Sequence, residues 1–412
     1  MYSLTMTNQR AATALIIGGG VGGPVAAAAL ARVGVEPVVL EAHSGPADQL
    51  GAFLTLAPNG LAVLRAVGMV EQVRAAASFA TTRTEFVNGA GRRLGLLGDE
   101  SHLPPELRSV TITRAALQRA VTEAATDQGV RFEYDKRLRS YADEGAQVTA
   151  TFDDGTDAAG DVLLGADGIH SAVRGGLGPD GPHPTYTGLL GIGGFVPAAD
   201  IPPTPPETVR MVFGSRAFFG YQCAPDGRTF WFANLGHSER SREEIAAHGD
   251  EAWRAHALDL FDGDLPELTR IMEAADLAQF RPLGTYDLPS LPRWHRGRVG
   301  ILGDAAHAVS PSSGQGASLA LEDALELARQ LSRHDPAAAL AAYESARRDR
   351  VERIAAVGRR RGTQKAGSSH PVALAVRDVS MRIAFTLIGR FGSQRWITDY
   401  RPDVADASRG RS

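Results

Sequence analysis

Three short segments of this chain carry residue types that hold a long anionic ligand, and they lie far apart, at residues 18–23, 165–168 and 303–307. They read Gly-Gly-Gly-Val-Gly-Gly, Gly-Ala-Asp-Gly and Gly-Asp-Ala-Ala-His. Glycines allow phosphate groups to approach backbone N–H donors closely. A short carboxylate at the end of a strand accepts hydrogen bonds from sugar hydroxyls. Together the segments indicate a site for a nucleotide-like molecule.

The first segment lies between an apolar run at 14–17 and an alanine-rich run at 24–32, which predict a strand, a tight turn and a helix. In the spacing G-x-G-x-x-G, the first glycine permits the turn, the second leaves room for a pyrophosphate, and the third lets helix and strand pack closely. A second strand at 36–40 ends at an acidic residue, which favours the ribose of FAD or NAD over that of NADP. The residues expected to contact the dinucleotide here are Gly18, Gly20, Val21, Gly22, Gly23 and Glu41. A glycine-rich turn in another kind of α/β protein is the alternative.

The overall composition excludes several other classes of site. A chain of 412 residues is long enough for two domains. Its formal net charge of −4 gives no reason to expect nucleic acid or an anionic membrane as a partner. Cys223 is the single cysteine of the sequence, so we expect no intrachain disulfide and no metal site built on cysteine, and a cytoplasmic location fits.

No stretch reaches the ~20 apolar residues of a membrane span, and residues 1–10 lack the apolar core of a signal peptide. The longest apolar stretch, 372–387, is interrupted by Arg377, Asp378 and Arg382. We interpret it as an amphipathic helix packed on the protein, with a helix on a membrane surface as the alternative. A basic run at 347–361 also carries acidic residues, which predicts a solvated helix face rather than a surface for nucleic acid.

The order of the expected strands and helices along the chain predicts two domains, each built from segments that are interrupted by the other. A strand at 147–152 is expected to turn at 153–155 and return through 161–164, and residues 208–235 read as two antiparallel strands rich in aromatic residues. The expected fold class is α/β, with a discontinuous Rossmann-like domain at 1–75, 106–178 and 281–365. An inserted, mostly antiparallel β domain at 76–105 and 179–280 would cover the ligand, and 366–412 would form a C-terminal helix and tail.

In this order and with these flanks, the three segments resemble the FAD-dependent aromatic hydroxylases of the p-hydroxybenzoate hydroxylase type. The resemblance spans 13–357 and implies non-covalently bound FAD. It places Asp167 near the pyrophosphate, Asp304 on the ribityl chain or ribose, and Arg114 at the ribityl–phosphate region. A helix-capping turn is the alternative for Asp167. His307 belongs to the third motif and is expected to have a structural role.

The loop at 311–316 and the strong helix pattern that follows it would place a helix N-terminus against the flavin. Gly314, Gly316 and Ala317 are the expected contacts of this loop and helix. The family often has asparagine at the position of Ser318 and arginine at that of Ala42, so the contacts at these two positions stay open.

The resemblance also implies a reaction: NADH or NADPH reduces the flavin, O2 adds at C4a, and the resulting hydroperoxide passes one oxygen to an electron-rich aromatic or polyketide-like molecule. A same-fold epoxidase or other oxidoreductase, and a non-catalytic flavoprotein that sequesters a ligand, remain alternatives. No catalytic residue is assigned. The residues expected to line the substrate pocket are Phe219, Tyr221, Trp231 and Pro311. The expected state is a monomer or a homodimer without stable membrane insertion.

Overall fold

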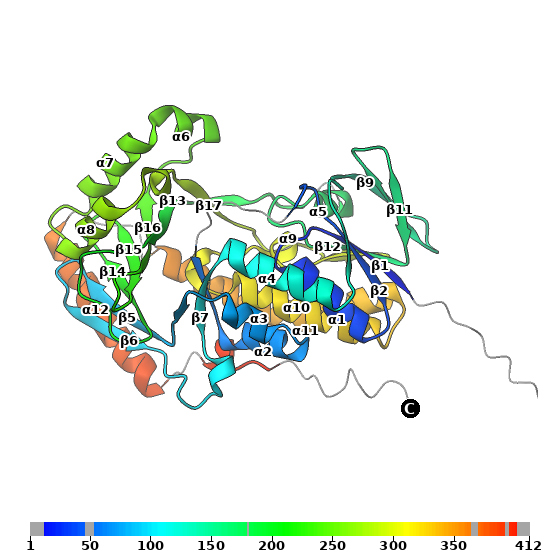
Figure 1. Ribbon diagram of the computed structural model, residues 1–412, viewed down its shortest axis with the longest axis horizontal. Helices are drawn as coiled ribbons and strands as arrows, with labels where there is room; N and C mark the ends of the chain where they lie inside the picture. Colours follow the sequence, from blue (N-terminus) through cyan, green and yellow to red (C-terminus); the bar gives the residue numbers. More distant parts are fainter. Residues whose placement is uncertain (1–11, 46–52, 179–180, 364–369, 392–394, 402–412) are drawn as a thin grey trace, which may run out of the picture.

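The computed structural model describes residues 12–45, 53–178, 181–363, 370–391 and 395–401. Within these residues the chain forms two large sheets, each covered by helices, which Figure 1 shows at opposite ends of the molecule. This arrangement confirms the predicted α/β class with a largely antiparallel second sheet.

The first sheet has six strands in the order β18-β19-β12-β1-β2-β8. Neighbours from β19 to β8 pair in parallel, so the carboxyl ends of these five strands share one edge. The three motifs directly follow β1, β12 and β19, which are adjacent strands, and the topology therefore brings them together at that edge. The strands are β1 (Thr13–Ile17), β2 (Glu36–Leu40), β8 (Arg131–Glu133), β12 (Val162–Gly165), β18 (His295–Arg296) and β19 (Val299–Ile301).

Alanine-rich helices pack closely around this sheet. In α1 (Gly22–Arg32) the side chains from Gly23 to Leu30 are buried, and their small size lets the helix lie against its neighbours. The surrounding helices are α2 (Pro58–Ala66), α3 (Val70–Ala75), α4 (Arg114–Asp127), α5 (Ala172–Leu177), α9 (Asp304–His307), α10 (Gly316–Leu331) and α11 (Pro336–Thr363). The prediction that 347–361 forms a solvated helix face is wrong for Arg347, which is 1% exposed. Arg347 can be buried because α10 places two carboxylates against it.

A small antiparallel sheet extends from the first one and contains β9 (Leu138–Asp143), β10 (Val148–Phe152) and β11 (Asp157–Gly160). The prediction that 161–164 is the return strand of this hairpin is wrong, because β10 returns through β11 and β12 instead pairs in parallel with β1. Asp161 alone separates β11 from β12, and its carboxylate accepts a hydrogen bond from the Thr13 N–H at 2.7 Å. Two strands separated by one residue look like one strand in the sequence.

The second large sheet has seven strands in the order β17-β13-β16-β15-β14-β5-β6. Its strands are β5 (Arg83–Asn88), β6 (Arg93–Leu97), β13 (Thr185–Val196), β14 (Thr208–Phe213), β15 (Phe218–Cys223), β16 (Thr229–Gly236) and β17 (Leu283–Asp287). Residues 208–235 thus form three strands rather than the predicted two. The extra break follows Gly214, where the Asp264 carboxylate accepts a hydrogen bond from the Ser215 N–H. The domain ranges stay a prediction, although β17 pairs with β13 and so extends this sheet to residue 287.

One face of the second sheet is covered by α6 (Arg242–His248), α7 (Asp250–Leu260) and α8 (Pro266–Ala274). Side chains of these helices, including Trp253, Leu268 and Met272, form one buried cluster with the sheet. A third, three-stranded sheet has the order β3-β7-β4 and contains β3 (Phe53–Leu56), β7 (Val110–Thr113) and β4 (Phe79–Ala80). The 3-10 helices are η1 (Pro105–Leu107), η2 (Leu277–Phe280) and η3 (Pro311–Ser313).

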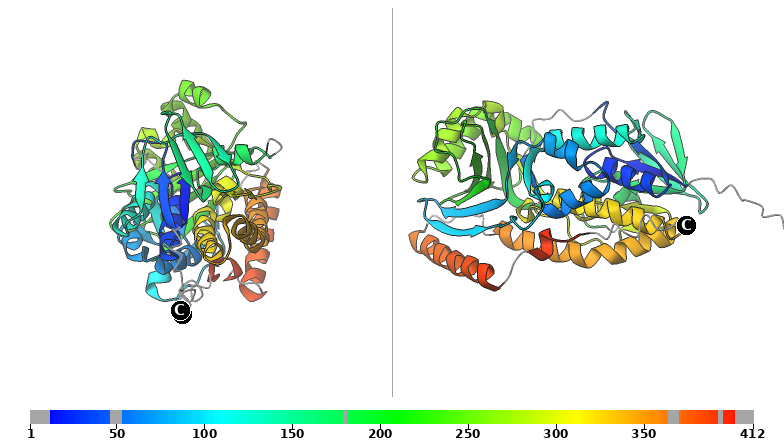
Figure 2. Two further views of the ribbon diagram at one scale, coloured as in Figure 1. Left: turned by 90° about the vertical axis from the view of Figure 1, so that its right-hand side faces the viewer. Right: turned by 60° about the horizontal axis from the view of Figure 1, so that its bottom comes forward.

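Near the C-terminus, α12 (Pro371–Phe391) packs on β6, which is the edge strand of the second sheet, as the right-hand view of Figure 2 shows. Phe385 stacks on Phe86 with ring centroids 4.5 Å apart, and Arg377 donates to the carbonyls of Phe213 and Gly214. The outer face of α12 exposes Val372, Val376, Val379, Ile383 and Leu387. In the described part of the chain, no helix has the length and hydropathy needed to span a bilayer. The short helix α13 (Arg395–Thr398) follows.

Glu344 on α11 fastens the edge of the first sheet to the helices. Its carboxylate accepts hydrogen bonds from the Trp294 N–H at 2.8 Å, from the His295 ring at 2.7 Å and from Arg348. Burial raises the pKa of this carboxyl, but the hydrogen bonds and the charge of Arg348 outweigh burial and lower the pKa from 4.5 to about 2.

This lowered pKa predicts how stability depends on pH. The contribution of Glu344 is fully present above about pH 4.5 and is lost as the pH falls toward 2, because the unfolded carboxyl takes up its proton first. The free energy of unfolding of Glu344→Gln at pH 7 should be about 2 kcal/mol lower than that of the wild type. Between pH 5 and pH 3, the free energy of unfolding of this variant should also change less than that of the wild type. Urea unfolding at several pH values measures both effects. Parallel pH profiles for the two proteins would contradict this assignment.

Candidate active site

A cavity of about 1950 Å³ lies between the two large sheets and is lined by residues of both. Ligand pockets usually measure about 300–1,000 Å³. This cavity is therefore large enough to hold a dinucleotide and a second molecule together.

The glycine loop after β1 lies at one side of this cavity. Gly18 has a φ of +108°, and a Cβ there would come within 2.6 Å of the Ala166 carbonyl oxygen. A Cβ at Gly23 would lie 2.0 Å from the Gly18 carbonyl oxygen, so both positions require glycine for packing. A Cβ at Gly20 would meet no atom within 4 Å, and Gly20 lines the cavity together with Val21 and Gly22. The space beside Gly20 is therefore free for a ligand, as the pyrophosphate requires.

Glu41 follows β2 and lies behind this loop. Its carboxylate accepts hydrogen bonds from the Gly19 N–H at 2.6 Å and from the His43 N–H at 3.0 Å. Glu41 is 9% exposed and is not part of the cavity lining. Glu41 thus supports the glycine loop, and its contact with a ribose stays a prediction.

Arg114 and Asp304, which are far apart in the sequence, meet at the cavity wall. Arg114 begins α4, and the Thr113 hydroxyl caps that helix by accepting a hydrogen bond from the Ala116 N–H. The Arg114 Nη2 atom lies 3.7 Å from Asp304 Oδ2, and both side chains line the cavity. A cation for phosphate and a carboxylate for hydroxyl groups are therefore adjacent, next to the glycine loop.

The N-terminus of α10 faces the same space. Gly314 has a φ of +63°, which favours glycine, and Gln315 is the N-cap residue of α10. Gly314, Gly316, Ala317 and Pro311 all line the cavity. The unpaired N–H groups at the start of this 16-residue helix carry partial positive charge, so a ring system with negative charge on its edge is favoured against them.

Asp167 has a local structural role. Its Oδ2 atom accepts hydrogen bonds from the N–H groups of Ala172 and Val173, at 2.8 and 3.1 Å, and so caps the start of α5. Burial raises the pKa of this carboxyl. Ala166 and Gly168 line the cavity, but Asp167 does not. The side chain therefore acts as the helix cap that was the alternative, and its contact with a cofactor stays a prediction.

The prediction that Phe219 and Tyr221 line the pocket is wrong. Both side chains are fully buried in the cluster between the second sheet and α7–α8. Trp231 touches the cavity, but its ring stacks on Phe219 at 5.4 Å and its indole N–H donates to Gln279. Strand alternation correctly grouped Phe219 with Tyr221, but it does not indicate which face of a sheet meets a ligand.

The opposite face of the same strands lines the cavity. Its side chains are Val209, Met211, Phe213, Phe218, Phe230 and Phe232. Phe53 from β3 stacks on Phe230 with centroids 5.2 Å apart, and Phe385 closes the far end from α12. Among the described residues of this sheet, none that lines the cavity is charged. One feature of the sequence could have identified the face that lines the cavity. The helices expected at 243–276 must bury their apolar side chains against one face of the sheet, so only the opposite face remains for a ligand.

Comparison with known proteins identifies the family. The family profile described as FAD binding domain matches residues 11–357. The chain belongs to the family of FAD-binding proteins that includes the aromatic hydroxylases. The FAD-dependent urate hydroxylase of Klebsiella pneumoniae is 29% identical over 361 residues, which cover 84% of this chain and 89% of that protein. The structure of Klebsiella pneumoniae HpxO complexed with FAD and uric acid has a TM-score of 0.78 at 28% identity, over 90% of this chain and 93% of that one.

A second kind of relative is also similar. The chloroplastic zeaxanthin epoxidase of Nicotiana plumbaginifolia is 32% identical over 368 residues, which cover 83% of this chain and 53% of that protein. The chain thus spans about half the length of the epoxidases it matches. The hydroxylase family uses FAD, and the residues of this site fit it: the free space beside Gly20, the Arg114–Asp304 pair and the N-terminus of α10 all face one cavity.

Proposed function

We propose that this protein is an FAD-dependent monooxygenase that uses NADH or NADPH and O2 to insert one oxygen atom into an apolar aromatic or polyketide-like small molecule. The observation that carries this proposal is the shared cavity, in which the N-terminus of α10 and the uncharged face of the second sheet line one space. Bound FAD would supply the redox chemistry and the activation of O2. The protein then has to orient the substrate and exclude water.

The chain's own residues suit those two tasks. The N–H groups at the start of α10 favour negative charge on a ring edge placed against Gly316 and Ala317. The face that carries Met211, Phe230 and Phe232 excludes water and offers aromatic contacts to a flat apolar molecule. Urate, which the Klebsiella relative is named for, is a polar purine, and the uncharged floor of this cavity favours a less polar substrate.

Epoxidation is a second candidate reaction, and the uncharged sheet face of the cavity together with the similarity to zeaxanthin epoxidase favours it. An epoxidase would transfer oxygen to a carbon–carbon double bond rather than to an aromatic ring. The structure of the product therefore decides between the two reactions, while the requirements for FAD, NAD(P)H and O2 are shared.

A substrate screen tests the proposal. Polycyclic phenols, polyketides, polyenes and uric acid are each added to the FAD-loaded protein, and the oxidation of NADH or NADPH is followed. We expect apolar compounds to stimulate the oxidation and the product to carry one oxygen atom that derives from ¹⁸O2. Label that comes only from water, or a dehydrogenated product, would reject oxygenation. Ligand binding without stimulated NAD(P)H oxidation would instead support a sequestering protein.

A further inference from the structure

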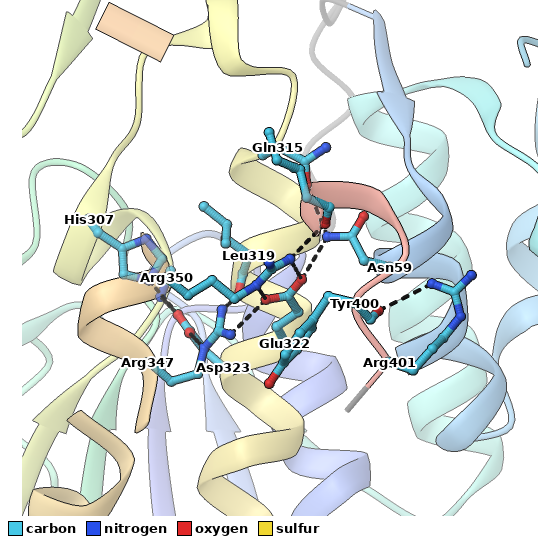
Figure 3. Close-up of polar contacts among 12 residues, drawn as sticks. Asn59, His307, Gln315, Leu319, Glu322, Asp323, Arg347, Arg350, Tyr400 and Arg401 are labelled. Atoms are coloured by element: carbon cyan, nitrogen blue, oxygen red, sulfur yellow. Dashed lines mark hydrogen bonds and ion pairs between the residues drawn. The ribbon is translucent and has the colours of Figure 1, made fainter. Parts of the chain in front are cut away.

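Helix α10 carries two adjacent carboxylates, Glu322 and Asp323, that the proposed function does not use. They are 1% and 0% exposed and are not part of the cavity lining. A buried carboxylate is costly unless it is paired and hydrogen-bonded. The partners of these two residues lead to two of the loops that line the cavity, the loop at Gly303–Asp304 and the loop that ends at Gln315 (Figure 3).

Asp323 holds the loop that carries Asp304. Its Oδ2 atom accepts hydrogen bonds from the Gly303 N–H at 3.0 Å and from the His307 ring at 2.5 Å. Gly303 has a φ of +58° and directly precedes Asp304. His307 therefore has the structural role expected for it, and Asp323 fixes the turn from behind.

Glu322 holds the other loop through Asn59. The Asn59 amide nitrogen donates to Glu322 Oε1 at 2.7 Å and to Gln315 Oε1 at 3.0 Å. Gln315 is the N-cap residue of α10, and it lines the cavity with Gly316 and Ala317. Asn59 and Gln315 are 0% and 5% exposed, so water does not replace these hydrogen bonds easily.

Two arginines of α11 complete the cluster from the other side. Arg347 Nη1 lies 2.7 Å from Glu322 Oε2, and its Nε donates to Asp323 at 2.8 Å, so it contacts both carboxylates. Arg350 donates to both Glu322 oxygens at 2.8 Å. This bidentate pairing fixes the orientation of the carboxylate as well as neutralising its charge.

Arg350 also holds the C-terminal segment, which we define as residues 395–401. Its guanidinium donates to the carbonyls of Trp396 and Ile397, at 2.9 and 2.7 Å, and lies 4.1 Å from the centre of the Tyr400 ring. The segment also contributes Arg395, Thr398 and Asp399 to the cavity wall. One cation thus joins a segment from the end of the chain to the helix whose N-terminus faces the cofactor.

We propose that the C-terminal segment is a working part of the FAD site, coupled to the N-terminus of α10 by the relay Arg350–Glu322–Asn59–Gln315. When the segment docks, Arg350 is held by two carbonyls and the Tyr400 ring, and it presents Glu322 to Asn59 in a single orientation. Asn59 then sets Gln315 and the first turn of α10 for the flavin. Arg350, Glu322 and Asn59 are positioning residues, since none of them lines the cavity. The inference rests on the proposed function only in taking FAD as the ligand.

A double-mutant cycle between the two ends of the relay tests the coupling. Tyr400→Ala loosens the segment without removing a buried charge, and Asn59→Ala breaks the link to Gln315. We expect each variant to raise the Kd of the apoprotein for FAD about 5- to 10-fold. The double variant should raise it no further than the stronger single one, because both changes break the same relay. The midpoint potential of the bound flavin should shift in the same direction in all three variants.

Tyr186→Ala is the matched control. Tyr186 is a half-buried tyrosine on β13 that is outside the cavity lining, so this variant should change the Tm but not the Kd for FAD. If Tyr400→Ala does not fold, Tyr400→Leu keeps most of the apolar bulk and removes the aromatic ring and its hydroxyl. Additive effects on Kd, or a lower apoprotein Tm with an unchanged Kd, would overturn the coupling. Failure of the wild-type protein to bind FAD would instead reject the proposed function.

Discussion

Gly20→Val is expected to remove FAD binding while the fold stays intact. A Cβ at this position meets no atom within 4 Å, and the residue lines the cavity, so the valine side chain would fill the space that the pyrophosphate needs. We expect the Kd for FAD to rise at least about 100-fold, which is about 2.7 kcal/mol. Titration of the apoprotein with FAD, followed by flavin fluorescence, measures the Kd, and the Tm of the apoprotein should equal that of the wild type.

Two other glycines provide matched controls for this variant. A Cβ at Gly236 also meets nothing within 4 Å, but Gly236 ends β16 outside the cavity lining, so Gly236→Val should retain FAD. At Gly23 a Cβ would lie 2.0 Å from a carbonyl oxygen, so Gly23→Val should unfold the protein. Wild-type affinity in Gly20→Val would show that the cofactor does not lie against this loop.

Phe219→Ala and Phe232→Ala should have opposite consequences, although both residues belong to neighbouring strands of one sheet. Phe219 is 0% exposed within the cluster under α7 and α8, and its truncation should lower the free energy of unfolding by about 3–5 kcal/mol. Phe232 is half-buried and lines the cavity. Its truncation should cost only about 1 kcal/mol of stability while raising the KM for a stimulating ligand about 10-fold, because an aromatic contact with the ligand is lost.

Urea unfolding and ligand-stimulated oxidation of NAD(P)H, measured on both variants, separate these two roles. The Kd for FAD should stay at the wild-type value in each, since neither side chain belongs to the three loops at the cofactor. If Phe219→Ala raised the KM and Phe232→Ala did not, the face predicted from the sequence would be the correct one after all.

Features that depend on local chemistry could be predicted from the sequence. The spacing of Gly18, Gly20 and Gly23 follows from turn geometry and packing, and the Thr113 cap follows from the preference of helix N-termini for hydroxyl groups. The three motifs are adjacent only because β1 pairs with β12 and β12 pairs with β19. These strands are far apart in the sequence, and no short turn between them indicates that they pair. The resemblance to a known family supplied that information instead.

Features that depend on distant partners could not be predicted. Arg347 lies in a run of mixed charges that is typical of a solvated helix, and only the carboxylates of α10 make its burial possible. Glu322 and Asp323 likewise look like ordinary helix residues in the sequence. Phe219 and Phe232 have the same local pattern, and the helices that arrive later in the chain decide which of the two is core.

The adjacency of β1, β12 and β19 has a consequence for how the protein is made. The glycine loop leaves the ribosome early, but β1 pairs with β12 at residues 162–165, β12 pairs with β19 at residues 299–301, and the helix that completes the site begins at Gly316. A nascent chain shorter than this has no complete cofactor site, so FAD cannot stabilise the N-terminal half during synthesis. We therefore expect FAD to be captured only after β12, β19 and α10 have been synthesised and folded, so that the yellow colour of the product reports completed folding rather than synthesis alone.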